Sequence, residues 1–506
     1  MVKYALICIV VVAFFLRLMT IGFESLDSDE ALTIVHSQGS ILHNIAWPLS
    51  DFYVPLYHVL LSIWSGIFGV GPIISRIPSA VLGTASIIII YLIGKDLFNE
   101  KTATIASVIM AFSSYQLTYS QNARPYALYM LLSLISIYLY LRFIKNPHFS
   151  KSYVLTSLLT LYTHAMAPLL LFAQNAHFFF CVRKNVRKWI WMQVLIGILY
   201  LPLIAFLLAK TLTLSGKEFL WIQDPNALSI FRIVYSYLSG LTFTLESLIL
   251  GALLTLYSCF LMAVFIWKDV FYRKIFFKKS NPIHFLILLF VVPFAFLAIY
   301  SISFTSVFEE HYMIFTSITL YLLLAASIEQ LGRHMQNIAL AVVLFLAIIT
   351  LFIDLTTPNR AQWNLLAESM NEKKADLVFV SAHNAKYALT YYLDNDLYLQ
   401  QTFGFDDLRY IQGFNDPLIF EEHLSKSDPN SFWLVFHNAE YTDPKLQSIK
   451  YAKEHYHLKK FEIVRGAGAY LFEKNQDNEI AAPAMHSSSQ YPDRRLDRLK
   501  DALRNI

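Results

Sequence analysis

Residues 5–23 read ALICIVVVAFFLRLMTIGF, and residues 24–30 continue as ESLDSDE. The first stretch is long and apolar enough to cross about 30 Å of hydrocarbon as a helix. The second stretch brings four carboxylates in seven residues to the end of that helix. Charge in the hydrocarbon is costly, so such a loop belongs at the membrane surface. The sequence therefore predicts a membrane helix that opens into an acidic loop.

Composition extends this prediction to most of the chain. Of the 506 residues, 56% are hydrophobic and 15% are charged, whereas a soluble domain carries roughly 25% charged residues. Apolar runs of near-span length recur, and strands with exposed edges do not survive in lipid. The fold class is therefore an α-helical polytopic membrane protein. A net charge of +4 gives no indication of nucleic-acid binding, and we expect no nucleic-acid partner.

About eleven transmembrane helices are predicted from the apolar runs. They cover residues 4–22, 76–95, 102–120, 126–143, 152–165, 168–182, 188–208, 244–266, 282–303, 312–328 and 336–354. The basic loops lie at 94–101, 141–151, 182–188 and 267–280. These loops should be cytoplasmic by the positive-inside rule. The N-terminus is then cytoplasmic, and the loops 23–75, 121–125, 209–243 and 304–311 face outward with the C-terminus.

The segment 55–69 is also apolar, but it is short for a span. If it crossed the membrane, every later basic loop would face outward. Its aromatic residues Tyr57, Trp64 and Phe68 suit the headgroup level. We therefore expect an interfacial or re-entrant helix on the outer side.

Three regions are predicted along the chain: a transmembrane domain at 1–355, an extracytoplasmic α/β domain at 356–475, and a polar tail at 476–506. In the α/β domain, ADLVFVSA (375–382) and SFWLVFHNA (431–439) have the composition of strands, and AKYALTYYL (385–393) that of a helix. The segment 456–474 predicts a closing hairpin that turns near Gly466 and Gly468.

The acidic loop admits two interpretations. Asp27 could cap a helix that starts near Ser28, with Glu30 reaching back as in a capping box. That interpretation does not involve Asp29. On a helix over SDEALTIVHSQG (28–39), Asp29 and His36 lie seven residues apart and so share one face. There they could share a proton or a metal ion, and the residues alone leave both interpretations open.

A second outward cluster lies in YSQNARPYAL (119–128). Pro125 suits the first position of a helix, where its missing N–H costs nothing. Arg124 then stands just ahead of a helix N-terminus, whose partial positive charge disfavours a cation. The arrangement makes sense if guanidinium and helix amides together bind a phosphate. The alternative is an arginine that reaches to the lipid headgroups.

Further polar residues stand at other outward helix ends. Arg76 lies in SRIPSA (75–80), and VFEEHYMIF (307–315) carries Glu309, Glu310 and His311. The loop TLTLSGKEFLWIQDPN (211–226) holds Glu218 and Trp221, which suit a sugar contact as well as an interfacial anchor. Each of these residues has surface anchoring as its alternative, but together they predict acids and bases around one outer site.

Three segments of the chain together resemble a known family. The segments DSDEALTIVHS, VPLYHVLLSIWSGIFGVGPIISRIPSAVLGTASIIIIYLIGKDLF and YSQNARPYALYMLLSLISIYLYL are similar, in this order, to the bacterial relatives of dolichyl-phosphate-mannose-protein mannosyltransferases. That family belongs to the glycosyltransferase C (GT-C) superfamily, together with the aminoarabinose transferases of lipid A. The resemblance covers residues 1–180 and continues more weakly to about 355.

The resemblance implies a GT-C fold in the bacterial plasma membrane, with the active site at the outer face. It also implies a polyprenyl-phosphate-linked sugar donor, inversion at the anomeric carbon and an extracytoplasmic acceptor that is a lipid, a polysaccharide or a protein. A divalent metal ion is a possible cofactor, since hard cations take carboxylate and phosphate oxygens.

Carried over by position, Asp29 matches the family's acidic residue, the expected general base or metal contact, and Glu30 its partner. Arg124 and Tyr126 match the R-P-Y element, which we expect to bind the donor phosphate. Arg76, Tyr57 and His311 are assigned to the same role. The further expected substrate contacts are His36, Asp51, Tyr53, Glu218 and Trp221.

The chain departs from the family pattern at three positions. Val54 replaces the first proline of P-P-L-Y, and Tyr53 stands where histidine or lysine is frequent. His311 stands where the family often has arginine, so it would hold phosphate only when protonated.

Two rival functions follow from the same sequence. A transporter or lipid flippase would bind its substrate near the membrane midplane, whereas the charges of this chain cluster at one face. A non-catalytic scaffold would present the C-terminal domain to other molecules. The sequence therefore favours a membrane glycosyltransferase.

Overall fold

The structure is a computed structural model that describes residues 2–50, 53–211, 222, 224–242, 244–270, 281–382, 385–393, 411–414, 416–437 and 443–474. The chain forms two compact units. The transmembrane unit comprises residues 1–21, 41–69 and 73–357. The C-terminal unit comprises residues 22–40, 70–72 and 358–506, so the acidic loop belongs to it and not to the unit that precedes it in the sequence.

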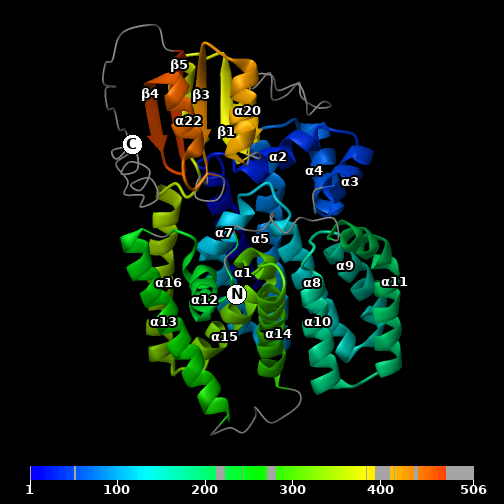
Figure 1. The fold of residues 1–506 in the computed structure, drawn as a ribbon. Coiled ribbons are helices and arrows are strands. Elements are labelled where there is room, and N and C mark those ends of the chain that lie inside the picture. The colour runs from blue at the N-terminus through cyan, green and yellow to red at the C-terminus, as the bar shows by residue number, and fades with distance from the viewer. Residues whose placement is uncertain are drawn as a thin grey trace. The chain divides into compact units, whose positions relative to one another are not determined.

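The regular secondary structure in the described part of the transmembrane unit is helical (Figure 1). Its helices are α1 (Val2–Met19), α3 (Ile41–Ser50), α4 (Pro55–Phe68), α5 (Pro72–Leu97), α6 (Glu100–Phe112), α7 (Ser114–Ser120), α8 (Tyr126–Lys145), η1 (Pro147–Phe149), α9 (Ser150–Leu161), α10 (Pro168–His177), η2 (Phe178–Val182), α11 (Val186–Thr211), α12 (Ala227–Ser239), α13 (Leu245–Lys268), α14 (Pro282–Ser303), η5 (Glu310–Thr316), α15 (Ser317–Glu329) and α16 (Arg333–Thr356).

Seven segments in the described part of the chain are long and apolar enough to cross a membrane, judged by length and composition. They lie in α5, α8, α11, α13, α14, η5 with α15, and α16. The chain is therefore a multi-pass membrane protein. The predicted span 102–120 is two helices, α6 and α7, because Ser113 leaves the helical conformation and its hydroxyl accepts a bond from the Gln116 amide. The predicted helix at 55–69 forms as α4.

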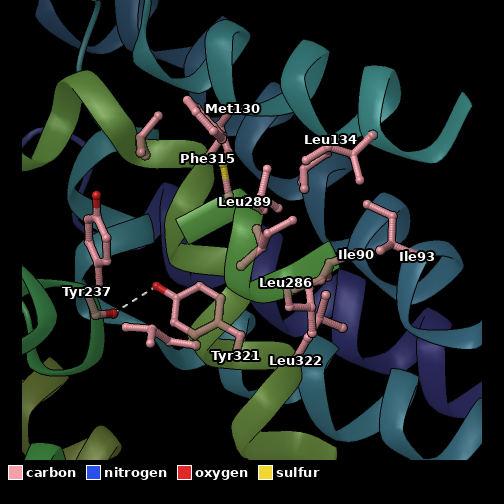
Figure 2. Close-up of a cluster of buried hydrophobic side chains, with 14 of the residues drawn as sticks. Ile90, Ile93, Met130, Leu134, Tyr237, Leu286, Leu289, Phe315, Tyr321 and Leu322 are labelled. Atoms are coloured by element: carbon pink, nitrogen blue, oxygen red, sulfur yellow. Dashed lines mark hydrogen bonds between the residues drawn. The ribbon is translucent and has the colours of Figure 1, made fainter. Parts of the chain in front are cut away.

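The core of the transmembrane unit brings together side chains from helices far apart in the sequence. Figure 2 shows Ile90 and Ile93 of α5, Met130 and Leu134 of α8, and Leu286 and Leu289 of α14 in one buried cluster. A polar tie crosses the same region, since the Tyr321 hydroxyl donates to the Tyr237 carbonyl at 2.8 Å. Without water nearby, a buried hydroxyl needs such a partner.

The C-terminal unit is built on a mixed five-stranded sheet. Its elements are α2 (Ser28–Ser37), α17 (Trp363–Asn371), β1 (Leu377–Ser381), α18 (Ala385–Leu393), β2 (Ile411–Phe414), α20 (Pro417–Ser427), β3 (Ser431–Phe436), α22 (Gln447–His455), β4 (Tyr456–Val464) and β5 (Ala467–Lys474). The strand order is β2-β1-β3-β5-β4, with β1 parallel to β2 and β3, and β5 antiparallel to β3 and β4.

Helices cover both faces of this sheet. Phe432 and Leu434 of β3 pack in one cluster with α20 and α22. Trp433 points to the opposite face, because side chains alternate along a strand. Its indole N–H donates to the carbonyl of Lys373, just beyond α17, at 2.9 Å. The sheet is thus the middle of three layers.

The strand and helix predictions for this region agree with the structure. The predicted helix 385–393 is α18. The two predicted strands contain β1 and β3. The predicted hairpin joins β4 to β5 and turns at Gly466, whose φ of +76° favours glycine. The predicted short helix in the tail 476–506 lies outside the described residues.

Candidate active site

In the C-terminal unit, α2 carries Asp29 in its first turn. Asp27 is the N-cap, and its carboxylate accepts a hydrogen bond from the Asp29 amide at 3.1 Å. The Asp27 cap predicted from the sequence is therefore present, whereas the Glu30 carboxylate, which was expected to complete a capping box, pairs with Arg360. The Asp29 side chain is half-buried, while His36, in the last turn of α2, is buried.

Glu30 has a partner that is distant in the sequence. Its carboxylate oxygen Oε2 lies 2.6 Å from Nη1 of Arg360, and the Glu30 side chain is fully buried. A buried charge needs such a partner, because its desolvation is otherwise uncompensated. The two neighbouring acids thus sit in different environments.

In the transmembrane unit, the start of α8 positions Arg124. Pro125 is the N-cap of α8, and its carbonyl accepts the first helical bond from the Tyr129 amide at 2.8 Å. The Arg124 guanidinium lies 4.6 Å from the centre of the Tyr53 ring, a cation–π distance. The predicted proline-marked helix start is therefore correct to within one residue. Arg124 and Tyr53, named separately from the sequence, are in contact.

Tyr126 and His311 also meet. Their rings lie 5.0 Å apart, edge to face. Tyr119 lies 5.1 Å from Tyr126 and 6.0 Å from His311. Tyr312 packs on His311 at 4.5 Å. The transmembrane unit thus places the imidazole of η5 among aromatic rings beside the first residue of α8.

Two carboxylates adjoin this imidazole. Glu309, Glu310 and His311 offer ligand atoms within 4.8 Å of one another, a spacing that suits a metal ion. Glu309 also forms an ion pair outside this group, since its Oε1 lies 3.3 Å from Nη2 of Arg232. Within the group, Glu310 Oε1 lies 4.0 Å from Nδ1 of His311. Burial, together with the Glu310 carboxylate, raises the pKa of Glu309 to about 7.

Tyr57 and Arg76 are buried in the transmembrane unit. Arg76 is fully buried and donates from Nη1 to the carbonyl of Ile21 at 2.8 Å, which ties α5 to the end of α1. The Tyr57 hydroxyl is 3.3 Å from the Ser79 hydroxyl. These contacts connect α4 to α5 and α5 to the end of α1.

Asp51, Glu218 and Trp221 lie outside the described residues. The sequence analysis did not identify Arg232, Tyr119 or Arg360. Tyr119 is the first residue of YSQNARPYAL (119–128), so its closeness in sequence to Arg124 and Tyr126 could have indicated it. Arg232 and Arg360 had none, because their partners lie 77 and 330 residues away.

Comparison with known proteins finds a family match over part of the chain and a shared fold. Residues 53–214 match the family model described as dolichyl-phosphate-mannose-protein mannosyltransferase. A comparison with curated protein sequences finds no match.

Similar solved structures come from bacteria and archaea. ArnT from Cupriavidus metallidurans in the apo state has a TM-score of 0.57 at 10% identity, over 92% of this chain and 97% of that chain. The same ArnT bound to undecaprenyl phosphate has a TM-score of 0.56 at 11% identity, over the same 92% and 97%. The oligosaccharyltransferase AglB from Archaeoglobus fulgidus, in complex with an inhibitory peptide and a dolichol-phosphate, has a TM-score of 0.55 at 12% identity, over 95% of this chain and 75% of that chain.

Residues 53–214 are thus similar to the dolichyl-phosphate-mannose-protein mannosyltransferase family, and the chain shares its fold with ArnT and the oligosaccharyltransferase AglB.

Proposed function

We propose that the chain is a membrane glycosyltransferase that moves one sugar from a polyprenyl phosphate to an acceptor, with inversion at the anomeric carbon. The observation that carries this proposal is the family match over residues 53–214, a range that contains the R-P-Y element and the start of α8. The GT-C fold supports it, as do the prenyl phosphates named in the two solved relatives.

The donor phosphate is assigned to Arg124 and the first amides of α8. A lipid phosphate leaves as a stable anion, so it requires positive charge more than a proton donor. The Arg124 guanidinium, which lies over the Tyr53 ring, and the N-terminal end of α8 supply that charge from fixed positions. Tyr126, with His311 at 5.0 Å, borders the same helix start.

Asp29 is assigned as the general base. The acceptor oxygen attacks the sugar C1 while its proton passes to the Asp29 carboxylate. The bond from C1 to the phosphate oxygen breaks, and the phosphate retains the electron pair. Attack from the side opposite the leaving phosphate gives inversion. Glu30 supports the segment through its ion pair with Arg360 and takes no proton in this scheme.

If a divalent ion takes part, Glu309, Glu310 and His311 would hold it among the described residues. Arg232 already neutralises Glu309 in part, and His311 adjoins Glu310. We therefore assign the positive charge for the leaving group to Arg124. We assign the site to the extracytoplasmic face of the bacterial plasma membrane, and the positions of the basic loops support this assignment through the positive-inside rule.

The proposal is tested with Asp29→Asn in the purified full chain. We expect transfer from a prenyl-phosphate sugar to fall by about a hundredfold or more, because a positioned base contributes about 10²–10⁴-fold. Asp27→Asn is the matched control: it makes the same chemical change two residues away and keeps a good N-cap. Full transfer by folded Asp29→Asn would remove the assignment. Flipping of prenyl phosphates without transfer by the wild-type chain would favour a flippase.

A further inference from the structure

The acidic loop is built into the C-terminal unit. Residues 22–40 group with residues 358–506 by their contacts, although more than 300 residues separate them in the chain. Helix α2, drawn in blue in Figure 1, is therefore part of the same unit as the yellow and orange strands of the sheet. Within this C-terminal unit, α2 contacts α18. The segment with Asp29 is thus held by residues that the family resemblance does not cover.

Backbone and carboxylate contacts hold the segment just before α2. The Glu24 carboxylate accepts hydrogen bonds from the amides of Asn359 at 2.6 Å and Arg360 at 3.3 Å. The Leu26 amide donates to the hydroxyl of Tyr392 in α18 at 3.0 Å. Both contacts lie on the N-terminal side of Asp29.

The ion pair between Glu30 and Arg360 holds the C-terminal side. Nη1 of Arg360 lies 2.6 Å from Oε2 of Glu30, and the two side chains are 13% and 0% exposed. Burial removes solvent screening, so this contact constrains geometry more than a surface pair would. Asp29 is therefore flanked on both sides, at Leu26 and at Glu30, by contacts to the C-terminal unit.

Helix formation alone does not require these contacts. Asp27 already caps α2 through the Asp29 amide. A cap fixes where a helix starts but not how it lies against another element. The Arg360 ion pair and the Tyr392 hydrogen bond add that orientation, because both come from elements after α16.

We infer that Arg360 is a positioning residue for Asp29: it holds the Glu30 side of the α2 start, so that the C-terminal unit determines where the proposed base lies. This inference rests on the proposed function for its catalytic consequence, while the contacts are independent of that function. Tyr392 supports the Leu26 side in the same way. A role of this kind gives the C-terminal unit a part in the transfer step without any substrate contact.

The test combines kinetics and hydrogen–deuterium exchange on the full chain in nanodiscs. A misplacement of about 1 Å at a reacting group can lower the rate by about a hundredfold. For Arg360→Ala we therefore expect kcat to fall by about ten- to a hundredfold with the donor KM nearly unchanged. Arg360→Lys keeps the charge but loses the planar fork, and should recover part of the rate. Lys459→Ala breaks an exposed ion pair with Glu473 in the same unit and should leave both constants unchanged.

Hydrogen–deuterium exchange measures how strongly Arg360 stabilises residues 24–37, independently of enzymatic activity. We expect the amides of residues 24–37 to exchange at least tenfold faster in Arg360→Ala than in Lys459→Ala, with the β3 and β5 amides unchanged. If the amides of residues 24–37 exchange equally fast in folded Arg360→Ala and in Lys459→Ala, the inference is overturned. If Arg360→Ala does not fold, Tyr392→Phe replaces it. We then expect the Leu26 amide to exchange faster than in the wild-type chain, and an unchanged exchange rate at Leu26 would count against the inference.

The two proposals fail separately. Full transfer by Asp29→Asn would remove the base while leaving the exchange result intact. Loss of transfer in Asp29→Asn, together with a normal kcat in Arg360→Ala, would overturn the positioning role alone.

Discussion

Arg124 shows how one residue can indicate a ligand. It directly precedes α8, where the helix end already carries partial positive charge, and its guanidinium lies over Tyr53. A cation at that place is electrostatically unfavourable unless an anion joins it. The residue type and its position next to a proline were both readable in the sequence. The contact with Tyr53 was not, because it depends on how the loop before α4 packs against α8.

We expect Arg124→Ala to lower transfer by about a hundred- to a thousandfold, the effect of removing one fixed donor to a developing anion. Arg142→Ala is the matched control: Arg142 lies at the other end of α8, and its Nε is 2.9 Å from Asp96. Transfer rates at saturating and limiting donor would be measured for both variants. A normal rate in folded Arg124→Ala would assign the arginine to the headgroup region instead.

At the scale of elements, helix contacts depend on small residues. Gly94 in α5 faces α6 so closely that a Cβ at this position would lie 2.9 Å from the Cα of Ala103. Small residues at such crossings let helix backbones approach in membranes. The sequence showed an apolar run here but not which neighbour it would meet.

Gly94→Ala should therefore destabilise the chain by about 1–3 kcal/mol, the usual cost of overpacking. Gly197→Ala is the matched control, because a Cβ there meets nothing within 4 Å and the gain in helix propensity is the same. The melting temperature in detergent would be compared for both variants. An equal or higher melting temperature for Gly94→Ala would show that α5 and α6 separate at no cost.

At the scale of the whole molecule, the proposed site requires positions 28 and 122 on one side of the membrane. Single cysteines at these positions, introduced after replacing Cys8, Cys181 and Cys259, should both react with an impermeant maleimide from outside. A cysteine at Lys184, in a basic loop, should react only after permeabilisation. Labelling of positions 28 and 122 from opposite sides would exclude a shared site.

The division into units also predicts that the C-terminal segment is incomplete by itself. In the full chain, α18 packs against α2, whose residues Leu32, Ile34 and Val35 are buried. Residues 358–475 expressed alone would leave that face of α18 uncovered. We expect the fragment to aggregate or to unfold with little cooperativity, and a fusion that appends residues 22–40 to restore a cooperative melt. A stable, monomeric fragment without residues 22–40 would contradict this.

Local patterns determined much of this protein from the sequence. Apolar runs, the Asp27 cap, the proline before α8, the helix 385–393 and the glycine turn between β4 and β5 all follow from interactions within a few residues. Helix α20 and strand β2 were not predicted, because short, weakly periodic segments carry little local signal.

Only the tertiary structure decided which partners these elements take. Glu30 meets Arg360, Tyr126 meets His311, and the loop after α1 joins the C-terminal unit. None of these pairings has a periodicity or a spacing that can be read along the chain. They arise when distant segments pack together and each buried charge or ring must find a partner in three dimensions.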